Sequence, residues 1–369
     1  MVPENRGLVL LGASSMALLA LALMVLALAP ASAESIDIYE FEEISTMYGA
    51  NAVAVNAQGS EGVVVWSEMN NTTRLYDNYV FTTSGAGLNQ RALYKSQSWY
   101  WRSAGYDPSG STCLMGGTSG ILYRYDGSTV TSVSSGIPYE IVDIEWHPTS
   151  GTAYLGTSTS RIYQYRSGSI SLLTYTTSSV YDMDMRPDGG ELAIAAYNYV
   201  QLYNISRDEM DTLSRPTDDD GNEYYYVYAV EYAIDGSNLM TNWYNWRQYA
   251  MLRFANDRWH EVATVSGQVR VMLFESEGTF SLLGMNNNLQ YMQGGSVSPV
   301  SDWFSTGASS VNDLAYNTKD FYFLIGTPDG VFKFKRKPNV NPWMDRPIPD
   351  LEFEEDVPDG GDNLLDLSV

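Results

Sequence analysis

The chain has 369 residues, with 44 acidic against 21 basic side chains and a formal net charge of −23. A surface of this sign repels phosphate backbones and anionic lipids, so nucleic acid is excluded as a partner and binding to an anionic membrane is disfavoured. Cys113 is the only cysteine, which excludes an internal disulfide, and its apolar neighbours predict a buried core position.

The N-terminal residues have the pattern of a secretory signal. Arg6 precedes an apolar run from Leu8 to Leu28, and Ala31-Ser32-Ala33 forms a small-residue cleavage site. We therefore predict a signal peptide over residues 1–33. The mature protein is then secreted or held at the cell surface, without membrane insertion. The alternative is an uncleaved anchor, because the apolar run is nearly long enough to cross a bilayer.

Seven related units follow one another along the rest of the chain. Each unit has the pattern of strand, tight turn, strand, short loop and strand, and the clearest copy runs from Val180 to Tyr203 with its turn at Pro187-Asp188-Gly189. A weaker fourth strand follows, as in Ser169 to Tyr175 or Glu261 to Val265. An aromatic residue closing the third strand marks a period of about 37 to 51 residues. These markers are Tyr76, Tyr125, Tyr165, Tyr203, Phe254, Tyr291 and Phe334.

One such unit cannot bury both faces of its sheet, so neighbouring units must stack into a ring. We predict an all-β fold over residues 34–337, a seven-bladed β-propeller of four-stranded antiparallel blades. Val180 to Gly189 resembles the WD40 repeat, and the resemblance covers roughly residues 50 to 336. No unit ends in Trp-Asp or opens with Gly-His, so the chain resembles the wider WD40/YVTN-like group. A β-sandwich or another class of propeller is the alternative.

Both ends of the predicted ring carry distinct segments. Ile36 to Phe41 is β-prone, whereas the last unit shows only three strands before Pro338. The resemblance to WD40-like rings implies that a chain terminus supplies the missing outer strand, and closure would remove a free sheet edge. We expect Ile36 to Phe41 to close the ring. Residues 338–369 are acidic and contain five prolines, and we expect a flexible tail there.

No motif of a hydrolase, zinc protease or phosphate-binding loop occurs in the sequence. The two histidines, His147 in a turn and His260 at the start of an outer strand, are expected to be structural or solvent-facing. We therefore expect no catalytic residues and a non-enzymatic protein.

Acidic residues recur at two equivalent positions of the first strands, which line the central channel of a propeller. The first position holds Asp143, Asp182 and Asp313, and the second holds Glu145, Asp184 and Glu231. These carboxylates either form an anionic channel that holds water or a cation, or accept hydrogen bonds from backbone groups between blades.

Acidic and aromatic insertions distinguish the fifth unit. In a four-stranded blade, the loops before the first strand and after the second emerge on the same face. We therefore predict a ligand-binding face there for a protein or glycan, with inter-blade packing as the alternative for its aromatic residues. The predicted residues are Asp218, Asp219, Asp220, Tyr224, Trp243, Tyr244, Trp246 and Asn286.

The acidic loop from Thr217 to Glu223 also suits calcium, with Asp218 and Asp220 as candidate ligands. It departs from an EF-hand because Pro216 stands where the first ligand would be, and a solvated acidic turn is the alternative. We expect no other cofactor.

These patterns favour a secreted or cell-surface propeller, monomeric and non-enzymatic, that binds a protein or glycan. The alternatives are an extracellular polysaccharide hydrolase or lyase that uses carboxylates in or near the channel, and a surface assembly factor.

Overall fold

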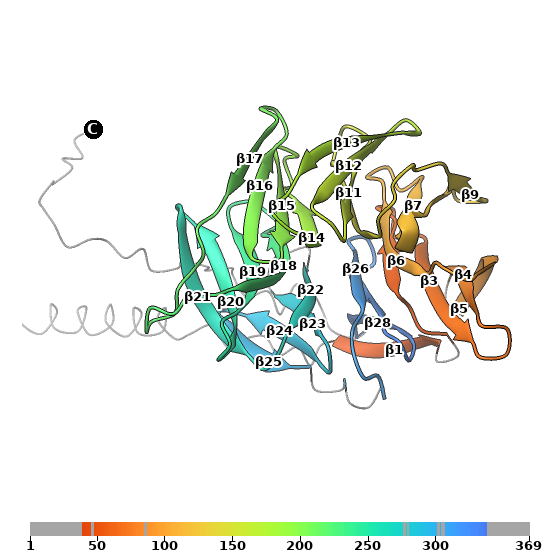
Figure 1. Cartoon of the computed structure of the whole chain (residues 1–369). Coiled ribbons are helices and arrows are strands. Elements are labelled where there is room, and N and C mark those ends of the chain that lie inside the picture. Colours follow the sequence, from red (N-terminus) through yellow and green to blue (C-terminus); the bar gives the residue numbers. More distant parts are fainter. Residues whose placement is uncertain are drawn as a thin grey trace, which may run out of the picture. The chain divides into compact units, whose positions relative to one another are not determined.

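Seven four-stranded antiparallel sheets surround a central axis in the computed structural model (Figure 1). It describes residues 39–337, with gaps at 46–47, 85–86, 276–277, 279, 301–302 and 304–306. The innermost strand of each sheet contacts the innermost strand of the next, and that of the last sheet contacts that of the first. The chain is therefore a closed seven-bladed β-propeller, as the sequence predicted.

Blades one to four each use four consecutive strands, with a short 3-10 turn, η2 (Thr118–Gly120), in blade two. Their strands are β2 (Ala52–Val55), β3 (Gly62–Asn70), β4 (Leu75–Ser84) and β5 (Gly87–Ser96); β6 (Trp101–Tyr106), β7 (Cys113–Gly117), β8 (Leu122–Tyr125) and β9 (Val130–Val133); β10 (Ile141–Trp146), β11 (Thr152–Thr157), β12 (Arg161–Arg166) and β13 (Ser169–Tyr175); β14 (Val180–Met185), β15 (Glu191–Ala196), β16 (Tyr199–Asn204) and β17 (Glu209–Thr212).

Blades five and six follow the same order, and blade seven combines the two ends of the ring. Their strands are β18 (Tyr226–Tyr232), β19 (Leu239–Tyr244), β20 (Tyr249–Ala255) and β21 (Arg258–Val265); β22 (Val269–Phe274), β23 (Ser281–Met285), β24 (Leu289–Gln293) and β25 (Ser296–Pro299); β26 (Asp313–Asn317), β27 (Tyr322–Gly326), β28 (Val331–Arg336) and β1 (Tyr39–Ser45).

An N-terminal strand closes the ring, as expected, with bounds that differ from the prediction. β1 pairs antiparallel with β28 from Tyr39 opposite Arg336 onward, and residues 36–38 lie outside the described part. The Tyr39 ring stacks on Phe334 with the centroids 5.0 Å apart. The Lys335 ammonium pairs with the carboxylate of Glu42 at 2.5 Å. The predicted signal segment and tail, residues 1–33 and 338–369, lie outside the described residues as well.

Blade one departs from the predicted alignment. Tyr76 lies near the start of the third strand, β4, and not at its end. The reason is that β3 and β4 pair over a long hairpin, from Gly62 opposite Thr83 to Asn70 opposite Leu75, which moves the third strand towards the C-terminus. The marker was therefore wrong for this blade, although the blade itself is where the period places it.

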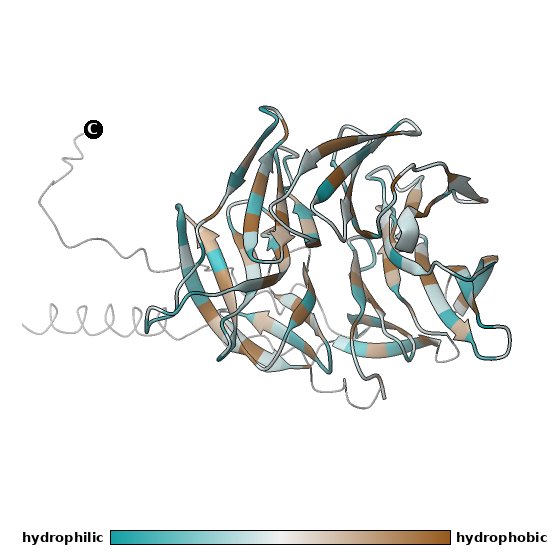
Figure 2. Ribbon diagram, in the orientation of Figure 1, coloured by the Kyte–Doolittle hydropathy of each residue, from teal (hydrophilic) through white to brown (hydrophobic). Residues whose placement is uncertain are grey.

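The hydrophobic core consists of seven clusters, one at each junction between neighbouring blades. Second strands are covered from both sides, and β7, β11, β23 and β27 are buried at every residue. Figure 2 shows apolar and polar residues alternating along many of the other strands. Cys113 is fully buried in the junction of blades one and two, as predicted, and burial raises the pKa of its thiol.

Two further observations concern the described residues. The Nδ1 of His147 accepts the backbone N–H groups of Thr149 and Ser150, both at 3.1 Å, so this histidine stabilises the turn after β10. Within residues 39–337, apart from the gaps, there is no helix with the length and apolar character that a membrane crossing requires.

Ring closure can be tested at Tyr39, which is 4% exposed. Tyr39→Ala removes a ring that packs on Phe334 and Phe280, and we expect the free energy of unfolding to fall by about 3 kcal/mol in urea titrations. Leu172→Ala on the outermost strand of blade three, where the side chain is 40% exposed, is the control and should cost less than about 1 kcal/mol. Equal losses in the two variants would contradict the closing role of β1.

Candidate functional site

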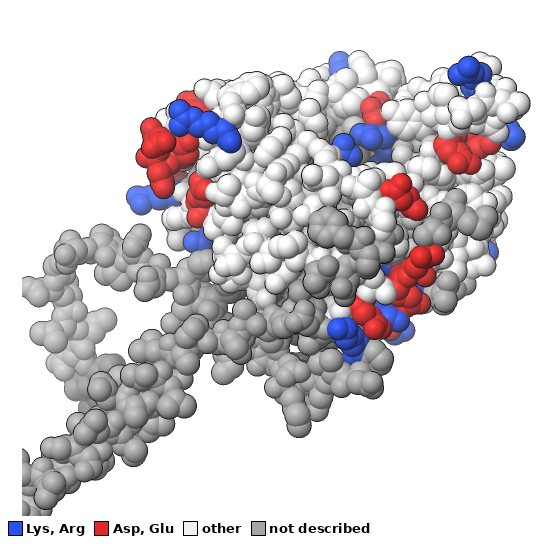
Figure 3. All heavy atoms as spheres, turned by 90° about the horizontal axis from the view of Figure 1, so that it is seen from below, with Lys and Arg blue, Asp and Glu red and all other residues white. Residues whose placement is uncertain are grey.

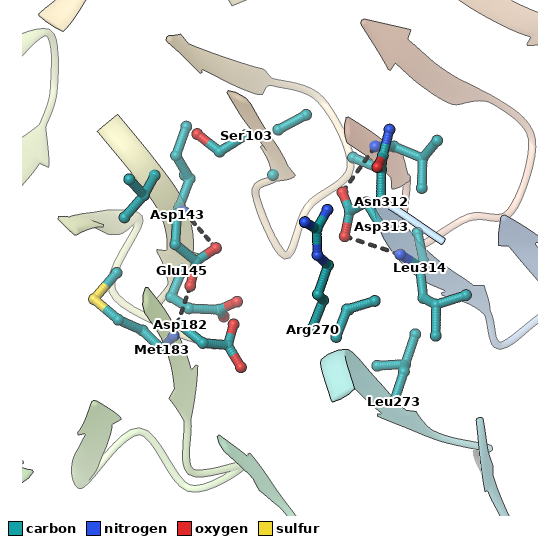
Figure 4. A pocket seen from close by; sticks show the side chains of 18 of the residues that line it. Ser103, Asp143, Glu145, Asp182, Met183, Arg270, Leu273, Asn312, Asp313 and Leu314 are labelled. Carbon is teal, nitrogen blue, oxygen red and sulfur yellow. Dashed lines mark hydrogen bonds between the residues drawn. The ribbon is translucent and has the colours of Figure 1, made fainter. Parts of the chain in front are cut away.

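A cavity of about 630 Å³ runs along the axis of the ring and is lined by the first strands of the blades. Its walls include Ser103, Asp143, Asp182 and Asp313, and Figure 4 shows Asp143, Glu145 and Asp182 grouped on one side of it. Five of the six predicted channel residues line the cavity. Asp184 is not among the residues that line this cavity; its carboxylate accepts the backbone N–H of Tyr232 in the first strand of the next blade and lies within electrostatic range of Asp143.

The channel aspartates connect neighbouring blades through hydrogen bonds. Each of three carboxylates accepts a backbone N–H from the first strand of the following blade, which agrees with the inter-blade alternative for these residues. The pairs are Asp143 with Met183 at 2.7 Å, Asp182 with Val230 at 2.9 Å, and Asp313 with Val53 at 2.8 Å. The last pair joins blade seven to blade one, so the same contact also spans the point where the ring closes. We call these contacts the inter-blade clasps.

Burial in the narrow channel raises the pKa of its carboxyl groups. The pKa of Asp143 is raised to about 6 and that of Asp313 to about 7, although the clasps oppose the shift. The pKa values of Glu145, Asp182 and Glu231 are raised well above the usual range, first by burial and then by neighbouring carboxylates. The channel therefore concentrates carboxyl groups where water solvates their charged forms poorly.

The predicted binding face around blade five is divided by the structure. Trp243 and Tyr224 are fully buried in the junction of blades four and five, so their expected surface exposure was wrong. Trp243 lies in β19 with its side chain turned inward, where it packs edge to face on Trp259. The Tyr224 hydroxyl donates to Glu261 and accepts from Gln248, both at 2.9 Å, so it supports the loop from beneath.

Trp246, by contrast, is 63% exposed and belongs to a continuous set of surface rings. It contacts Tyr226 and Tyr225 with ring centroids 5.2 and 6.4 Å apart, and Tyr226 in turn contacts Tyr197 at 4.9 Å. Tyr197 stacks on Tyr181 at 5.9 Å. These residues come from four separate segments of the chain.

Three more rings extend this set along blade five. Tyr244 stacks on Tyr249 at 4.4 Å, Tyr249 contacts Tyr228 at 6.3 Å, and Tyr228 contacts Tyr181 at 5.7 Å. The aromatic surface, as we name it, consists of Tyr181, Tyr197, Tyr225, Tyr226, Tyr228, Tyr244, Trp246 and Tyr249. All eight lie at starts of first or third strands, ends of second strands, or the loops between them, and such positions share one face of the ring.

The predicted residues did not include six members of this surface, Tyr181, Tyr197, Tyr225, Tyr226, Tyr228 and Tyr249. Tyr181 and Tyr197 lie outside the insertions of the fifth unit, so neither stands out in the sequence, whereas Tyr225, Tyr226, Tyr228 and Tyr249 lie close to predicted residues. The signal that could have found them is the position of each residue within the four-strand repeat. Residues at equivalent strand ends of neighbouring blades must lie on the same face of the ring. Tyr181 and Tyr228 also line the cavity, so the aromatic surface continues directly into the mouth of the channel.

The acidic loop lies on the same face and is organised by Asp218. Its Oδ1 accepts the backbone N–H of Asn222 at 2.8 Å, and its Oδ2 accepts the side-chain amide of Asn245 at 2.9 Å. The hydrogen bonds from Asn222 lower the pKa of Asp218. Among residues that the structure describes, no group of three His, Cys, Asp or Glu side chains is arranged for a metal ion.

The remaining predicted face residues lie at its edges. Asp220 is exposed and faces Arg247 at 3.4 Å, and Asp219 is exposed beside it. Asn286 is exposed on blade six and donates to Gln268, which lines the channel mouth. Figure 3, which views one side of the molecule, shows charged side chains gathered in a few separate clusters with wide uncharged areas between them.

Comparison with solved structures shows the fold. A chain of the crystal structure of a mitotic checkpoint complex matches with a TM-score of 0.61 and 16% identity, over 81% of this chain and 93% of that one. In all, 1610 chains of solved structures match, which shows how widely the fold is shared and how little it decides about function. No protein-family model and no curated protein sequence matches the chain.

The two tryptophans of blade five should differ sharply in their effect on stability. Trp243→Ala empties a fully buried position, and we expect a loss of about 3–5 kcal/mol in the free energy of unfolding. Trp246→Ala removes an exposed ring and should change it by less than about 1 kcal/mol. Urea titrations followed by circular dichroism measure both, and a large loss in Trp246→Ala would show that this ring belongs to the core.

The channel carboxylates should make stability depend on pH. Because their folded pKa values lie above the unfolded ones, the native state binds more protons, and stability falls as pH rises from about 4 to 7. Glu145→Gln removes one of the crowded charges, so we expect the free energy of unfolding to rise by about 1–2 kcal/mol at pH 8 and to change little at pH 4.

The exposed Asp188 provides the control for this pH series. Arg186 and the Gly190 N–H lower its pKa, so Asp188→Asn should lower stability at pH 8, the opposite sign. Destabilisation by Glu145→Gln at pH 8 would mean that the Glu145 carboxylate makes a favourable contact in the channel.

Proposed function

We propose that this chain is a non-enzymatic binding module, secreted or displayed at the cell surface, that holds a protein partner on the aromatic surface. The observation that carries the proposal is the continuity of that surface. Eight rings from blades four and five touch one another, and Trp246, Tyr181 and Tyr197 are 63%, 43% and 37% exposed. An exposed aromatic patch of this kind on a folded protein is typical of an interaction site.

The composition of the surface favours a protein over a glycan. Tyrosine and tryptophan are the residue types enriched at protein interfaces, where they supply apolar area at a low cost in side-chain entropy. Several rings meet at steep angles, such as the 81° between the planes of Tyr226 and Trp246. They therefore form an uneven surface of ring edges and ring faces. A sugar ring stacks best on the open face of a single aromatic ring, whereas an uneven aromatic surface suits the side chains of a protein partner.

A rigid scaffold supports this use. The inter-blade clasps and the seven junction clusters fix the first strands, and the rings are held by contacts with one another. A surface organised before binding loses little freedom when the partner docks.

One observation favours a second function, the cleavage of a polysaccharide. Carboxyl groups with raised pKa values, Glu145 among them, line the channel, and a carboxylic acid that stays protonated near neutral pH can act as a general acid. Three of these groups are engaged in the clasps, which is the reason we rank this function second.

Both functions can be tested with one purified preparation of residues 34–369. It would be screened on arrays of extracellular proteins and of glycans, and incubated with polysaccharides while reducing ends are measured. We expect protein hits whose dissociation constant rises by about 30-fold in Trp246→Ala, which corresponds to about 2 kcal/mol. Tyr175→Ala removes another tyrosine, 58% exposed and outside the aromatic surface, and should leave the affinity unchanged.

Other outcomes would decide against this proposal. Glycan hits that depend on Trp246, without protein hits, would show that the aromatic surface binds carbohydrate and not protein. Release of reducing ends that is lost in Glu145→Gln would support cleavage. Protein hits that survive Trp246→Ala would place the binding site elsewhere on the ring.

A further inference from the structure

The aromatic surface is bordered by negative charge on two sides, and this combination selects the chemistry of a partner. We propose that the partner presents a cationic segment, rich in arginine or lysine, whose side chains lie on the aromatic surface and reach into the mouth of the acidic channel. This inference rests on the proposed function and names the kind of partner for the same site.

Two rings of this region already contact one guanidinium group within the chain itself. The Cζ of Arg215 lies 4.5 Å from the centroid of Tyr199 and 5.8 Å from that of Tyr225, a member of the aromatic surface. The face of an aromatic ring attracts a cation through its quadrupole, and arginine is the commonest such partner. The exposed rings of Trp246 and Tyr181 offer the same interaction to a guanidinium from outside.

Carboxylates flank these rings along the outer edge of the blades. The Asp220 side chain is 79% exposed and that of Glu223 is 54% exposed, and both belong to the connection that leads into blade five. Arg247 and Arg215 face them at 3.4 and 3.5 Å. Asp218 and Asp219 add two further carboxylates to this loop, so the edge retains an excess of negative charge.

The channel supplies the second acidic border. Tyr181 and Tyr228 belong to both the aromatic surface and the cavity wall, and Asp182 and Glu231 line the same cavity on the same two blades. Burial first, and then the charge of neighbouring carboxylates, raises the pKa of these groups, and a cation at the mouth would favour their charged forms. The net charge of −23 would also attract a cationic partner over a distance.

Two arginines at the mouth limit the direction of approach. Arg102 comes from blade two and pairs at 2.6 Å with Glu140, which directly precedes β10 of blade three, and Arg270 comes from blade six. Their positive charge opposes a cation arriving over those blades. The cationic segment would therefore cross from the acidic loop of blade five over Trp246 towards Tyr181.

Selection from a random dodecamer peptide library provides the test. The library would be selected on purified residues 34–369 and counter-selected on the double variant Tyr181→Ala, Trp246→Ala. Both proteins have the same net charge, so peptides that bind any acidic surface are removed. Circular dichroism and urea titration would confirm that the double variant is folded, as the exposure of both side chains predicts.

We expect the retained peptides to be enriched in arginine or lysine. Synthetic copies with citrulline in place of arginine should bind at least about 10-fold more weakly, because citrulline keeps the shape and loses the charge. Tyr181→Phe preserves the ring and should keep the affinity within about 2-fold, whereas Tyr181→Ala should weaken it by about 5-fold. Tyr175→Ala, outside the aromatic surface, should have no effect.

The outcomes separate this inference from the proposed function. Peptides without enrichment in cationic residues, or with equal affinity for the citrulline copies, would overturn the cationic segment and leave the aromatic surface as a binding site. The absence of any peptide that depends on the two rings would overturn the inference as well. The proposed function is decided separately, by whether the arrays yield protein hits that depend on Trp246.

Discussion

Every blade of this protein has two apolar faces, and a four-stranded sheet of this kind is stable only when both are covered. The seven junction clusters show how the constraint is met, since each blade buries one face against the preceding blade and the other against the following one. In a closed ring, every apolar blade face is covered by a neighbouring blade. The position of the channel, and of the loops on both sides of the ring, follows from this closure.

The channel combines two opposing electrostatic effects. The inter-blade clasps provide hydrogen bonds between blades, because Asp143, Asp182 and Asp313 accept amide protons that would otherwise be unpaired in the wall. The same residues, with Glu145 and Glu231, bring several carboxyl groups into a confined space that solvates them poorly. A feature that aligns the blades therefore also creates a local field, and that field extends to the mouth beside the aromatic surface.

The sequence predicted the architecture well because the architecture depends on local, repeated signals. Period-two alternation, glycine turns and one aromatic residue per unit were enough for seven blades, whereas closure by the N-terminus was inferred from the three-stranded last unit and the resemblance to WD40-like rings. The site was predicted less well because it depends on single-residue register. Tyr224, Tyr225 and Tyr226 are consecutive, yet the first is buried and the second is exposed. Likewise Trp243 in β19 points inward, whereas Trp246 in the following loop points outward, and only strand pairing decides between them.

The closing strand has a consequence for the order of folding. Glu42 and Lys335, which meet across β1 and β28, are separated by 293 residues along the chain. β1 is therefore synthesised first and paired last, and closure of so long a loop is slow. Until then, both β1 and the outer edge of β28 can join strands of other molecules. The β1 edge therefore stays unpaired on the growing chain until β28, the last strand of the ring, has been made.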